Sequence, residues 1–413
     1  MLDSRRWIVA SVVSLLLAGF IFLCLQVCVG AYLSGNGSPS RLEQATMWDP
    51  LNAEPWVRLG HQDYLGELAP ERSLRDFDHA VHLNPLDAQA WLEMAYAAQA
   101  AGKLELQRTA LERALAADPT TPAYELAAAN SYLAAGDAQT GFQQLRDIVK
   151  SDPDSLPSAL DLAWRASHDA ALILRQIVPG NTEGQLIFLQ LLASRDREQD
   201  AAAVWKSVLA QQKPYDPTLV FPYVQYLLEK GLGAQAQSVW YELTSHKEFS
   251  GYRSSANLLV NAGFENDVLN AGLDWRYQPL AHINVRLGTS AVHGGKRALC
   301  LTFDGAAAET GISQYVAVDP GTEYELTGFY RSDQLEGAGG LQWEVRDVVT
   351  HNVLFPASPE SATFPPSLLW EEFRDSFKTA PETSVVLIKL ERVPAGDILR
   401  GTGCLDDLSL SRK

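Results

Sequence analysis

Cysteine is scarce in this sequence. Four cysteines occur in 413 residues: Cys24, Cys28, Cys300 and Cys404. No Cys-x-x-Cys pair is present, and no Cys/His cluster has the spacing of zinc ligands, so a zinc or iron–sulfur site is not expected. Four cysteines in a chain of this length also exclude a small, disulfide-dense scaffold.

Basic residues are few and dispersed. Lys and Arg number 33 against 50 Asp and Glu, which gives a formal net charge of -17. Residues 251–413 hold 14 basic and 21 acidic residues, and residues 1–250 hold 19 and 29, so both parts are acidic. Nucleic-acid phosphates are bound by clustered Lys and Arg. We therefore predict no nucleic-acid partner, and any membrane attachment has to be hydrophobic.

One apolar run is long enough to cross a membrane. It extends from Trp7 to Leu33, 27 residues without a charge, and about 20 helical residues span a bilayer core. Arg5 and Arg6 precede it, so the positive-inside rule places the N-terminus in the cytoplasm. We predict a single-pass protein of the cell inner or plasma membrane. The bulk of its chain would be periplasmic or extracellular.

Two alternatives to an uncleaved anchor remain open. One is a cleaved signal peptide, whose apolar region is usually about 7–15 residues, with Val29-Gly30-Ala31 as the cleavage site. The other is lipidation of Cys28, although Val27 stands where a lipoprotein site requires a small residue. All three possibilities export the rest of the chain.

A repeat of about 34 residues follows the apolar run. Pro50, Pro85, Pro119 and Pro153 are spaced 35, 34 and 34 residues apart, each after Asp or Asn. Proline cannot continue a helix, so each is expected to stop one helix and begin the next at its first turn. This pattern resembles the tetratricopeptide repeat. The resemblance implies an all-α solenoid over residues 35–250, with about six helix pairs. Its concave face would bind a protein partner.

The pattern changes after residue 250 to short alternating runs separated by Gly, Pro and Asp. We expect no helix here, and nine short strands that form a β-sandwich over residues 251–413. The expected strands cover residues 258–260, 283–287, 298–303, 312–318, 323–332, 341–348, 371–378, 385–393 and 404–411. The fold class is thus multidomain. A cytoplasmic stub and transmembrane anchor (residues 1–34) would be followed by the helical repeats and the sandwich.

Several segments of the sandwich resemble a known family. Asn257–Glu265 reads Asn-Leu-Leu-Val-Asn-Ala-Gly-Phe-Glu, Gly294-Gly295-Lys296-Arg297 precedes a strand, and Asp406-Asp407-Leu408-Ser409-Leu410 closes the domain. Together they resemble the jelly-roll carbohydrate-binding modules of the cellulase-associated type. The resemblance implies a domain that contacts a sugar or polysaccharide and is not a catalyst.

The resemblance also implies a structural Ca²⁺ ion. Calcium prefers oxygen ligands, and the matching residues here are Glu265, Asp406, Asp407 and the carbonyls near Gly294. The alternative is that these acids cap turns or pair with Lys296 and Arg297. No other cofactor is expected.

Strand alternation selects candidate sugar-binding residues. Leu341, Trp343 and Val345 form the better core set of their strand, so the intervening side chains face outward. Sugars require aromatic rings flanked by hydrogen-bonding groups. The candidates are Trp275, Tyr277, Tyr330, Arg331, Gln342, Glu344 and Arg346.

Cys300 and Cys404 lie on predicted strands that are neighbours in the resembling fold. The exported location permits a disulfide between them. The argument against it is that Cys300 alternates out of phase with the core residues Leu299 and Leu301.

No motif of an enzyme class was found: there is no GxSxG, Walker loop, HExxH or redox pair. We therefore predict a membrane-anchored, exported binding protein and no enzyme. The repeats would bind a protein partner and the sandwich a glycan, in polysaccharide assembly or export. One alternative is a protein-interaction scaffold with a structural jelly roll. Another is a glycoside hydrolase using Glu344 and Glu391, since such enzymes need two carboxylates about 5–10 Å apart.

Overall fold

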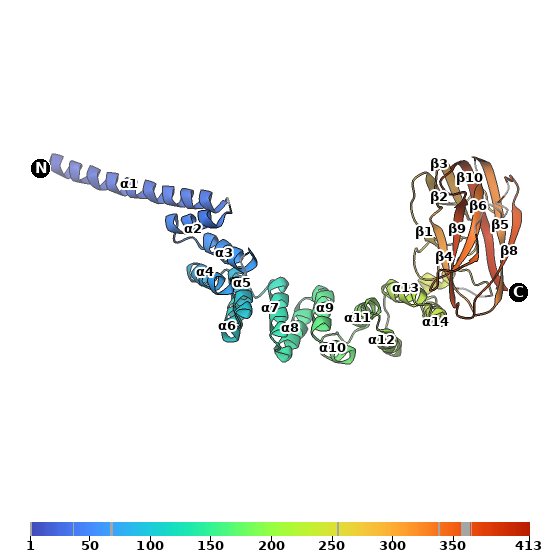
Figure 1. The fold of residues 1–413 in the computed structure, drawn as a ribbon, viewed down its shortest axis with the longest axis horizontal. Helices are drawn as coiled ribbons and strands as arrows, with labels where there is room; N and C mark the ends of the chain where they lie inside the picture. The colour runs from blue at the N-terminus through green and yellow to red at the C-terminus, as the bar shows by residue number, and fades with distance from the viewer. Residues whose placement is uncertain are drawn as a thin grey trace. The chain divides into compact units, whose positions relative to one another are not determined.

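The structure is a computed structural model that describes residues 2–35, 37–66, 69–253, 256–337, 339–356, 364 and 366–413. The chain divides into two compact units, Met1–Leu191 and Leu192–Lys413. Figure 1 shows a long N-terminal helix, a succession of helices and a C-terminal β-sandwich. The N-terminal helix is apolar, so the predicted fold class is confirmed.

The N-terminal helix α1 (Leu2–Gly35) contains the predicted apolar run. It is long and apolar enough to cross a membrane over Ser11–Gly35, 25 residues of which the most apolar part is not buried by the rest of the protein. A signal sequence near the N-terminus has the same properties. The presence of the helix is confirmed, and its topology stays a prediction.

After the short helix α2 (Pro39–Trp48) the helices follow one another in pairs. The first helices of the pairs are α3 (Ala53–His61), α5 (Ala88–Ala100), α7 (Pro122–Ala134), α9 (Leu156–Ala166), α11 (Thr182–Ser194) and α13 (Phe221–Glu229). The second helices are α4 (Pro70–Leu83), α6 (Leu104–Ala117), α8 (Ala138–Ser151), α10 (Ala170–Gln176), α12 (Glu198–Ala210) and α14 (Gly233–Leu243). The first four pairs begin at intervals of 35, 34 and 34 residues, as the proline spacing predicts.

Pro153 begins a 3₁₀ turn (Pro153–Ser155) that leads directly into α9, as predicted, whereas the other repeated prolines act differently. Pro50 and Pro85 lie in the turn ahead of a helix, and the helix itself begins three residues later. Its N-terminal amides are capped by side chains: Asn52 accepts from the N–H of Glu54, and Asp87 accepts from the N–H of Ala90. Capping by Asn or Asp satisfies amides that have no partner within the helix.

Small residues let the two helices of a pair approach closely. Gly60 on α3 faces the ring of Phe77 on α4, and a Cβ added at Gly60 would lie 2.8 Å from a ring carbon. Phe77 is fully buried. The Leu-Gly pair of the repeat pattern therefore has a packing role in the first repeat.

The sandwich consists of two antiparallel sheets of five strands each. The first, which we call sheet A, has the order β1-β4-β9-β6-β7, and the second, sheet B, has the order β2-β3-β10-β5-β8. Between them lies a core that includes Trp275, Trp343 and Tyr324. The strands are β1 (Arg276–Tyr277), β2 (Ile283–Gly288), β3 (Ala298–Ala306), β4 (Ile312–Ala317), β5 (Glu323–Gly337), β6 (Gly340–Asp347), β7 (Val353–Phe355), β8 (Glu371–Lys378), β9 (Val385–Val393) and β10 (Ile398–Arg412).

Residues 258–260 are the one predicted strand that is wrong. They form a bend and a turn. The side chain of Asn257 makes hydrogen bonds to the backbone of β10 that a neighbouring strand would otherwise make. Its amide nitrogen donates to the carbonyl of Leu408, and its amide oxygen accepts from the N–H of Leu410. Asn261 and Phe264 then take positive φ values of 51° and 56°, which a regular strand does not permit. The short strands β1 and β7 were not predicted.

Cys300 and Cys404 form a disulfide in the structure. They lie directly opposite one another on the adjacent strands β3 and β10. Both side chains are buried although neither belongs to the core between the sheets. The alternation argument against the disulfide therefore fails, because cysteines on the outer faces of two neighbouring strands can pair with each other.

The last helical pair packs on the sandwich within the second unit. Trp240 of α14 is 2% exposed and donates its Nε1–H to the carbonyl of Tyr252 at 3.0 Å. Its ring lies against Gly272, where an added Cβ would come within 2.0 Å of it. The Ser384 hydroxyl, ahead of β9, donates to the carbonyl of Gly231. Helices α13 and α14 are thus joined to the sandwich by both packing and hydrogen bonds.

Candidate functional site

Three of the predicted sugar-binding residues lie together on the outer face of sheet A. Gln342, Glu344 and Arg346 on β6 are opposite Glu391, Lys389 and Leu387 on β9. The alternate residues of both strands, among them Trp343 and Ile388, point into the core. This alternation is the one predicted from the sequence, although Gln342 is only 3% exposed and is therefore not accessible as predicted. We call the six residues of β6 and β9 the polar face.

Two ion pairs organise the polar face. Arg346 donates from Nη2 to Oε1 of Glu344 at 2.8 Å, and Lys389 pairs with Glu391 on the neighbouring strand. The Glu344 and Glu391 side chains are only 14% and 16% exposed, while those of Arg346 and Lys389 are 36% and 31% exposed. The cations are therefore the accessible groups, and the carboxylates lie beneath them.

The part of this face formed by β1 and β4 is in contact with the helical pair α13–α14. Arg276 on β1 hydrogen-bonds Gln225 on α13, and its guanidinium lies 4.4 Å from the ring centre of Tyr315 on β4. Burial lowers the pKa of Arg276. Tyr315 therefore has a ring face covered by Arg276, and the accessible part of this surface is the polar face on β6 and β9.

The remaining predicted sugar-binding residues lie elsewhere. Trp275, expected in a loop at the rim, is 1% exposed and packs against Phe264 and Trp343 in the core. Tyr330 is 5% exposed, and burial raises the pKa of its hydroxyl to about 12. Neither ring is accessible to a ligand, because both are packed in the apolar core between the sheets.

Tyr277 and Arg331 are also separated from the polar face. Tyr277 lies on the edge strand β1 and packs partly against the core. Arg331 lies on β5 of the other sheet, opposite Cys404. The predicted set thus divides into one cluster of three residues and four residues in other places.

An aromatic cluster on the outer face of sheet B was not predicted. The imidazole of His293 stacks on Phe329 of β5 with ring centres 3.6 Å apart, and Trp370 meets His293 edge-on at 5.9 Å. Its members come from three separate segments, so strand alternation alone does not bring them together. Alternation does predict that Phe329 faces outward, because it alternates out of phase with the core residues of β5.

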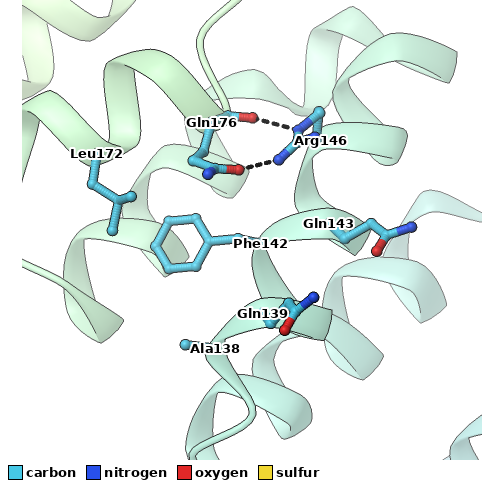
Figure 2. A pocket seen from close by; sticks show the side chains of 7 residues that line it. All are labelled: Ala138, Gln139, Phe142, Gln143, Arg146, Leu172 and Gln176. Carbon is cyan, nitrogen blue, oxygen red and sulfur yellow. Dashed lines mark hydrogen bonds between the residues drawn. The ribbon is translucent and has the colours of Figure 1, made fainter.

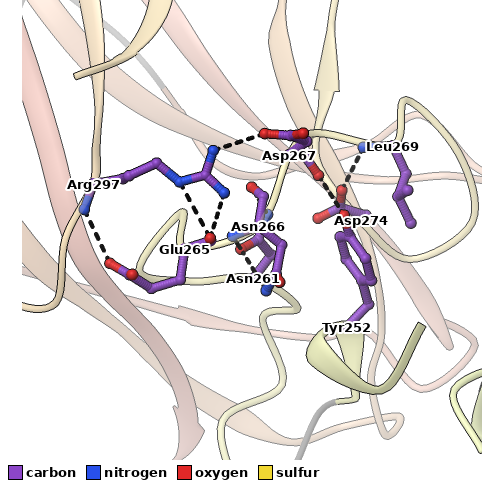
Figure 3. A network of polar contacts seen from close by, with 8 residues as sticks. All are labelled: Tyr252, Asn261, Glu265, Asn266, Asp267, Leu269, Asp274 and Arg297. Carbon is purple, nitrogen blue, oxygen red and sulfur yellow. Dashed lines mark hydrogen bonds and ion pairs between the residues drawn. The ribbon is translucent and has the colours of Figure 1, made fainter. Parts of the chain in front are cut away.

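The four residues predicted to bind calcium gather around the turn at residues 293–297 (Figure 3 shows Glu265 with Arg297). Oδ2 of Asp406 accepts the N–H groups of His293 and Gly294 at 2.7 and 3.1 Å. Oε1 of Glu265 accepts those of Lys296 and Arg297 at 2.7 and 3.1 Å, and the first of these bonds lowers the pKa of Glu265.

These contacts correspond to the turn-capping alternative. A Ca²⁺ ion takes 6–8 oxygen ligands, whereas the carboxylates of Glu265 and Asp406 are directed at N–H donors. Oδ2 of Asp407 accepts from the ring Nδ1 of His293 at 2.7 Å. Among the residues that the structure describes, no group of three or more His, Cys, Asp and Glu side chains is arranged to hold a metal. Calcium stays a prediction from the family resemblance.

The same region contains a buried carboxyl group that makes stability depend on pH. Asp274 is fully buried beside the network in Figure 3, and the N–H of Leu269 donates to its Oδ2 at 2.7 Å. Burial raises the pKa of Asp274 from 3.8 to about 7. Between these values the folded protein holds a proton that the unfolded chain has lost. The free energy of unfolding therefore falls as the pH rises from about 4 to about 7.

We expect this loss to approach about 1.4 kcal/mol per pH unit in the middle of the window. It should disappear in Asp274→Asn, which cannot ionise. The measurement is the denaturant midpoint of both proteins at several pH values. Asp267→Asn is the control, because the Asp267 side chain is 90% exposed. Equal pH slopes in Asp274→Asn and in the unmodified protein would contradict the assignment.

Two grooves of the helical unit lie among helices α7 to α10. One of about 510 Å³ lies between the first helices α7 and α9, and its lining includes Asn130, Asp161 and Arg165. The other, of about 490 Å³, lies between the second helices α8 and α10 (Figure 2). There Arg146 donates from Nε to the carbonyl of Gln176 at 2.8 Å, beside the ring of Phe142.

Comparisons with known proteins found structural likeness only. No family model and no curated protein matches the chain. A xylan-binding CBM22-1 domain from Paenibacillus barcinonensis Xyn10C is 17% identical, covers 39% of this chain and 97% of its own, with a TM-score of 0.30. A structure titled "CBM4 structure and function" is 18% identical and covers 38% of this chain and 99% of its own, with a TM-score of 0.28.

A third similar structure is that of the protein MamA. It is 15% identical and covers 46% of this chain and 92% of its own, with a TM-score of 0.31. TM-scores near 0.3 and identities below 20% carry no conclusion about what this chain binds. The fold assignment rests on the helices and sheets described above.

Proposed function

We propose that this protein is a membrane-anchored, exported binding protein. In this proposal α1 stays in the membrane with its N-terminus in the cytoplasm, the helical pairs bind a protein partner and the polar face binds a glycan. Polysaccharide assembly or export is the process we infer. The polar face carries the proposal, because it presents hydrogen-bonding groups on a rigid sheet where strand alternation predicts them.

An uncleaved anchor is supported by the packing of the last turns of α1. Ser34 is 6% exposed, and its carbonyl accepts from Nη1 of Arg58 on α3 at 2.8 Å. Gly30 is buried against Asp49, which follows α2. Cleavage after Ala31 would remove Gly30 and the helix that precedes it. The end of α1 thus serves as part of the helical array, a role that a cleaved signal peptide does not have.

A polar ligand is favoured at the polar face by the groups it exposes. Arg346 and Lys389 provide donors, whereas the Gln342 side chain is only 3% exposed and lies beneath this surface. Sugar hydroxyls are recognised by such side chains when they are held in fixed positions. An aromatic platform is absent from the six residues of the polar face, so we expect charge and hydrogen bonding to provide most of the affinity.

The test compares two arginines on opposite faces of the sandwich. We expect Arg346→Ala to weaken binding of the full chain to a recognised polysaccharide about tenfold or more, since hydrogen bonds to charged groups contribute roughly 1.5–3 kcal/mol. Arg374→Ala is the control, because Arg374 on β8 of sheet B is likewise ion-paired, with Glu325 and Glu372, whereas Arg346 pairs with Glu344. Affinity electrophoresis in a detergent without a sugar headgroup gives the measurement.

Other outcomes would reassign the function. Loss of binding in Arg374→Ala alone would place the glycan on sheet B, where the aromatic cluster lies. Failure to bind any tested polysaccharide would leave the protein-interaction scaffold as the better hypothesis. A glycoside hydrolase predicts cleavage of the bound glycan that is lost in Glu344→Gln. The two candidate carboxylates, Glu344 and Glu391, lie on adjacent strands, offset by two residues in the register.

The first unit contains a groove in which we expect the protein partner to bind. The groove between α7 and α9 lies on the first helices of two adjacent pairs, and such helices form the concave face in repeat arrays. Arg165 at its edge and Asp161 on the same helix face form an ion pair at 3.4 Å. A peptide segment of mixed charge is the ligand that we expect here.

A further inference from the structure

Apolar side chains are exposed at the end of helix α2. Met47, Trp48 and Leu51 are 72%, 45% and 82% exposed, although they follow one another within five residues. The opposite face of α2 is well packed, with Leu42 and Ala45 fully buried. Adjacent exposed apolar residues of this size indicate an interaction surface. We call these three residues the apolar tip of α2.

The position of the apolar tip relative to α1 is fixed by direct contact. A Cβ added at Gly30 would lie 2.6 Å from the Cβ of Asp49, the residue that follows Trp48. Helices α1 and α2 pack against each other in the same unit, as Figure 1 shows. The apolar tip therefore lies at about the level of Gly30 along α1.

That level coincides with the expected surface of the bilayer. The apolar run covers residues 7–33, and about 20 of these fill the hydrocarbon core. The outer boundary of the core then falls between residues 26 and 33, whichever 20 are chosen. Gly30 lies within four residues of every such boundary, or about 6 Å at 1.5 Å per residue. The headgroup layer has a similar depth.

We propose that Met47, Trp48 and Leu51 insert into the interface between headgroups and acyl chains of the outer lipid leaflet. This inference rests on the proposed retention of α1 as an anchor. Tryptophan suits this depth because its ring is apolar and its N–H is polar. Segment 39–51 carries Arg41 against Glu43 and Asp49, so zwitterionic lipid suffices. Insertion of these three side chains would hold the first helical pair at the membrane surface.

The experiment uses the full chain in phosphatidylcholine nanodiscs whose acyl chains are brominated close to the headgroup. Bromine quenches tryptophan fluorescence at short range, and two of the ten tryptophans should be affected, Trp7 and Trp48. We expect quenching in the unmodified protein to be reduced in Trp7→Phe and abolished in the double variant Trp7→Phe/Trp48→Phe. Trp7→Phe/Trp56→Phe, which removes a half-buried tryptophan of α3, should stay as quenched as Trp7→Phe.

The outcomes separate this inference from the anchor on which it rests. Equal quenching in Trp7→Phe and in Trp7→Phe/Trp48→Phe would overturn the interfacial contact. Quenching that vanishes completely in Trp7→Phe would also overturn it, while leaving the anchor supported. No quenching in the unmodified protein would overturn both, since neither end of the apolar run would then lie in a bilayer.

Discussion

Replacing Cys300 and Cys404 together by alanine should lower the free energy of unfolding of the second unit by about 2–5 kcal/mol. The disulfide joins residues 104 apart in the sequence, and a loop of about 100 residues gives one of the larger entropy terms expected for a single crosslink. It joins β10, the central strand of sheet B, to its neighbour β3. Its loss therefore acts on the middle of the sheet.

The measurement is hydrogen exchange of the β3 and β10 amides, with denaturant titration of the same protein. Local exchange is preferable to a single melting temperature, because a chain with two compact units need not unfold in one step. Cys24→Ala/Cys28→Ala is the matched control, since these cysteines lie on α1 and form no disulfide. Unchanged protection in Cys300→Ala/Cys404→Ala would contradict a stabilising crosslink. Peptide mapping without reductant should recover residues 300 and 404 in one linked fragment.

The disulfide also bears on where the protein works. Disulfides form and persist in oxidising compartments and are rare in the cytosol. A crosslink in the sandwich agrees with the export that the apolar run and its flanking arginines predict. The two lines of argument are independent, because one uses hydrophobic length and flanking charge and the other uses the pairing of two strands.

Local patterns in the sequence predicted the parts of the fold that depend on local physics. Helix pairs follow the proline spacing because a proline interrupts one helix shortly before the next begins, and in the first two repeats Asn52 and Asp87 then cap the next helix. The polar face follows from alternation, which places Trp343 inside and Glu344 outside on the same strand. These properties are set by a residue and its near neighbours, so a single sequence contains them.

The features that depend on distant residues were not predicted. Alternation does not apply to Trp275, which precedes the two-residue strand β1, and only the packed core decides that its ring is buried. The aromatic cluster requires the contact between His293 and Phe329. Arg276 was not singled out either, because its importance comes from Gln225 on α13 and Tyr315 on β4. Contacts between residues far apart in the sequence cannot be predicted from short-range patterns.

The contact between α14 and the sandwich gives the second prediction with a large effect. Gly272 has a φ of +59°, and an added Cβ would come within 2.0 Å of the Trp240 ring. Gly272→Ala therefore has two costs, a strained backbone and a clash with a buried ring. Gly321 has nearly the same φ, +63°, but nothing lies within 4 Å of an added Cβ. Gly321→Ala thus has the backbone cost alone.

We expect Gly272→Ala to lower the free energy of unfolding more than Gly321→Ala does, by about 1–3 kcal/mol, the usual cost of overpacking. Backbone strain of about 1–3 kcal/mol is common to both variants and cancels in the comparison. Denaturant titration gives the two free energies. Hydrogen exchange of α14 then shows whether the helical pair has loosened from the sandwich. Equal destabilisation by the two variants would mean that Trp240 has room to move, and that α14 and the sandwich are not held by this contact.

A larger loss of stability in Gly272→Ala, together with faster exchange in α14, would mean that the contact with Trp240 holds the helical pair α13–α14 in place beside the sheet that carries the polar face.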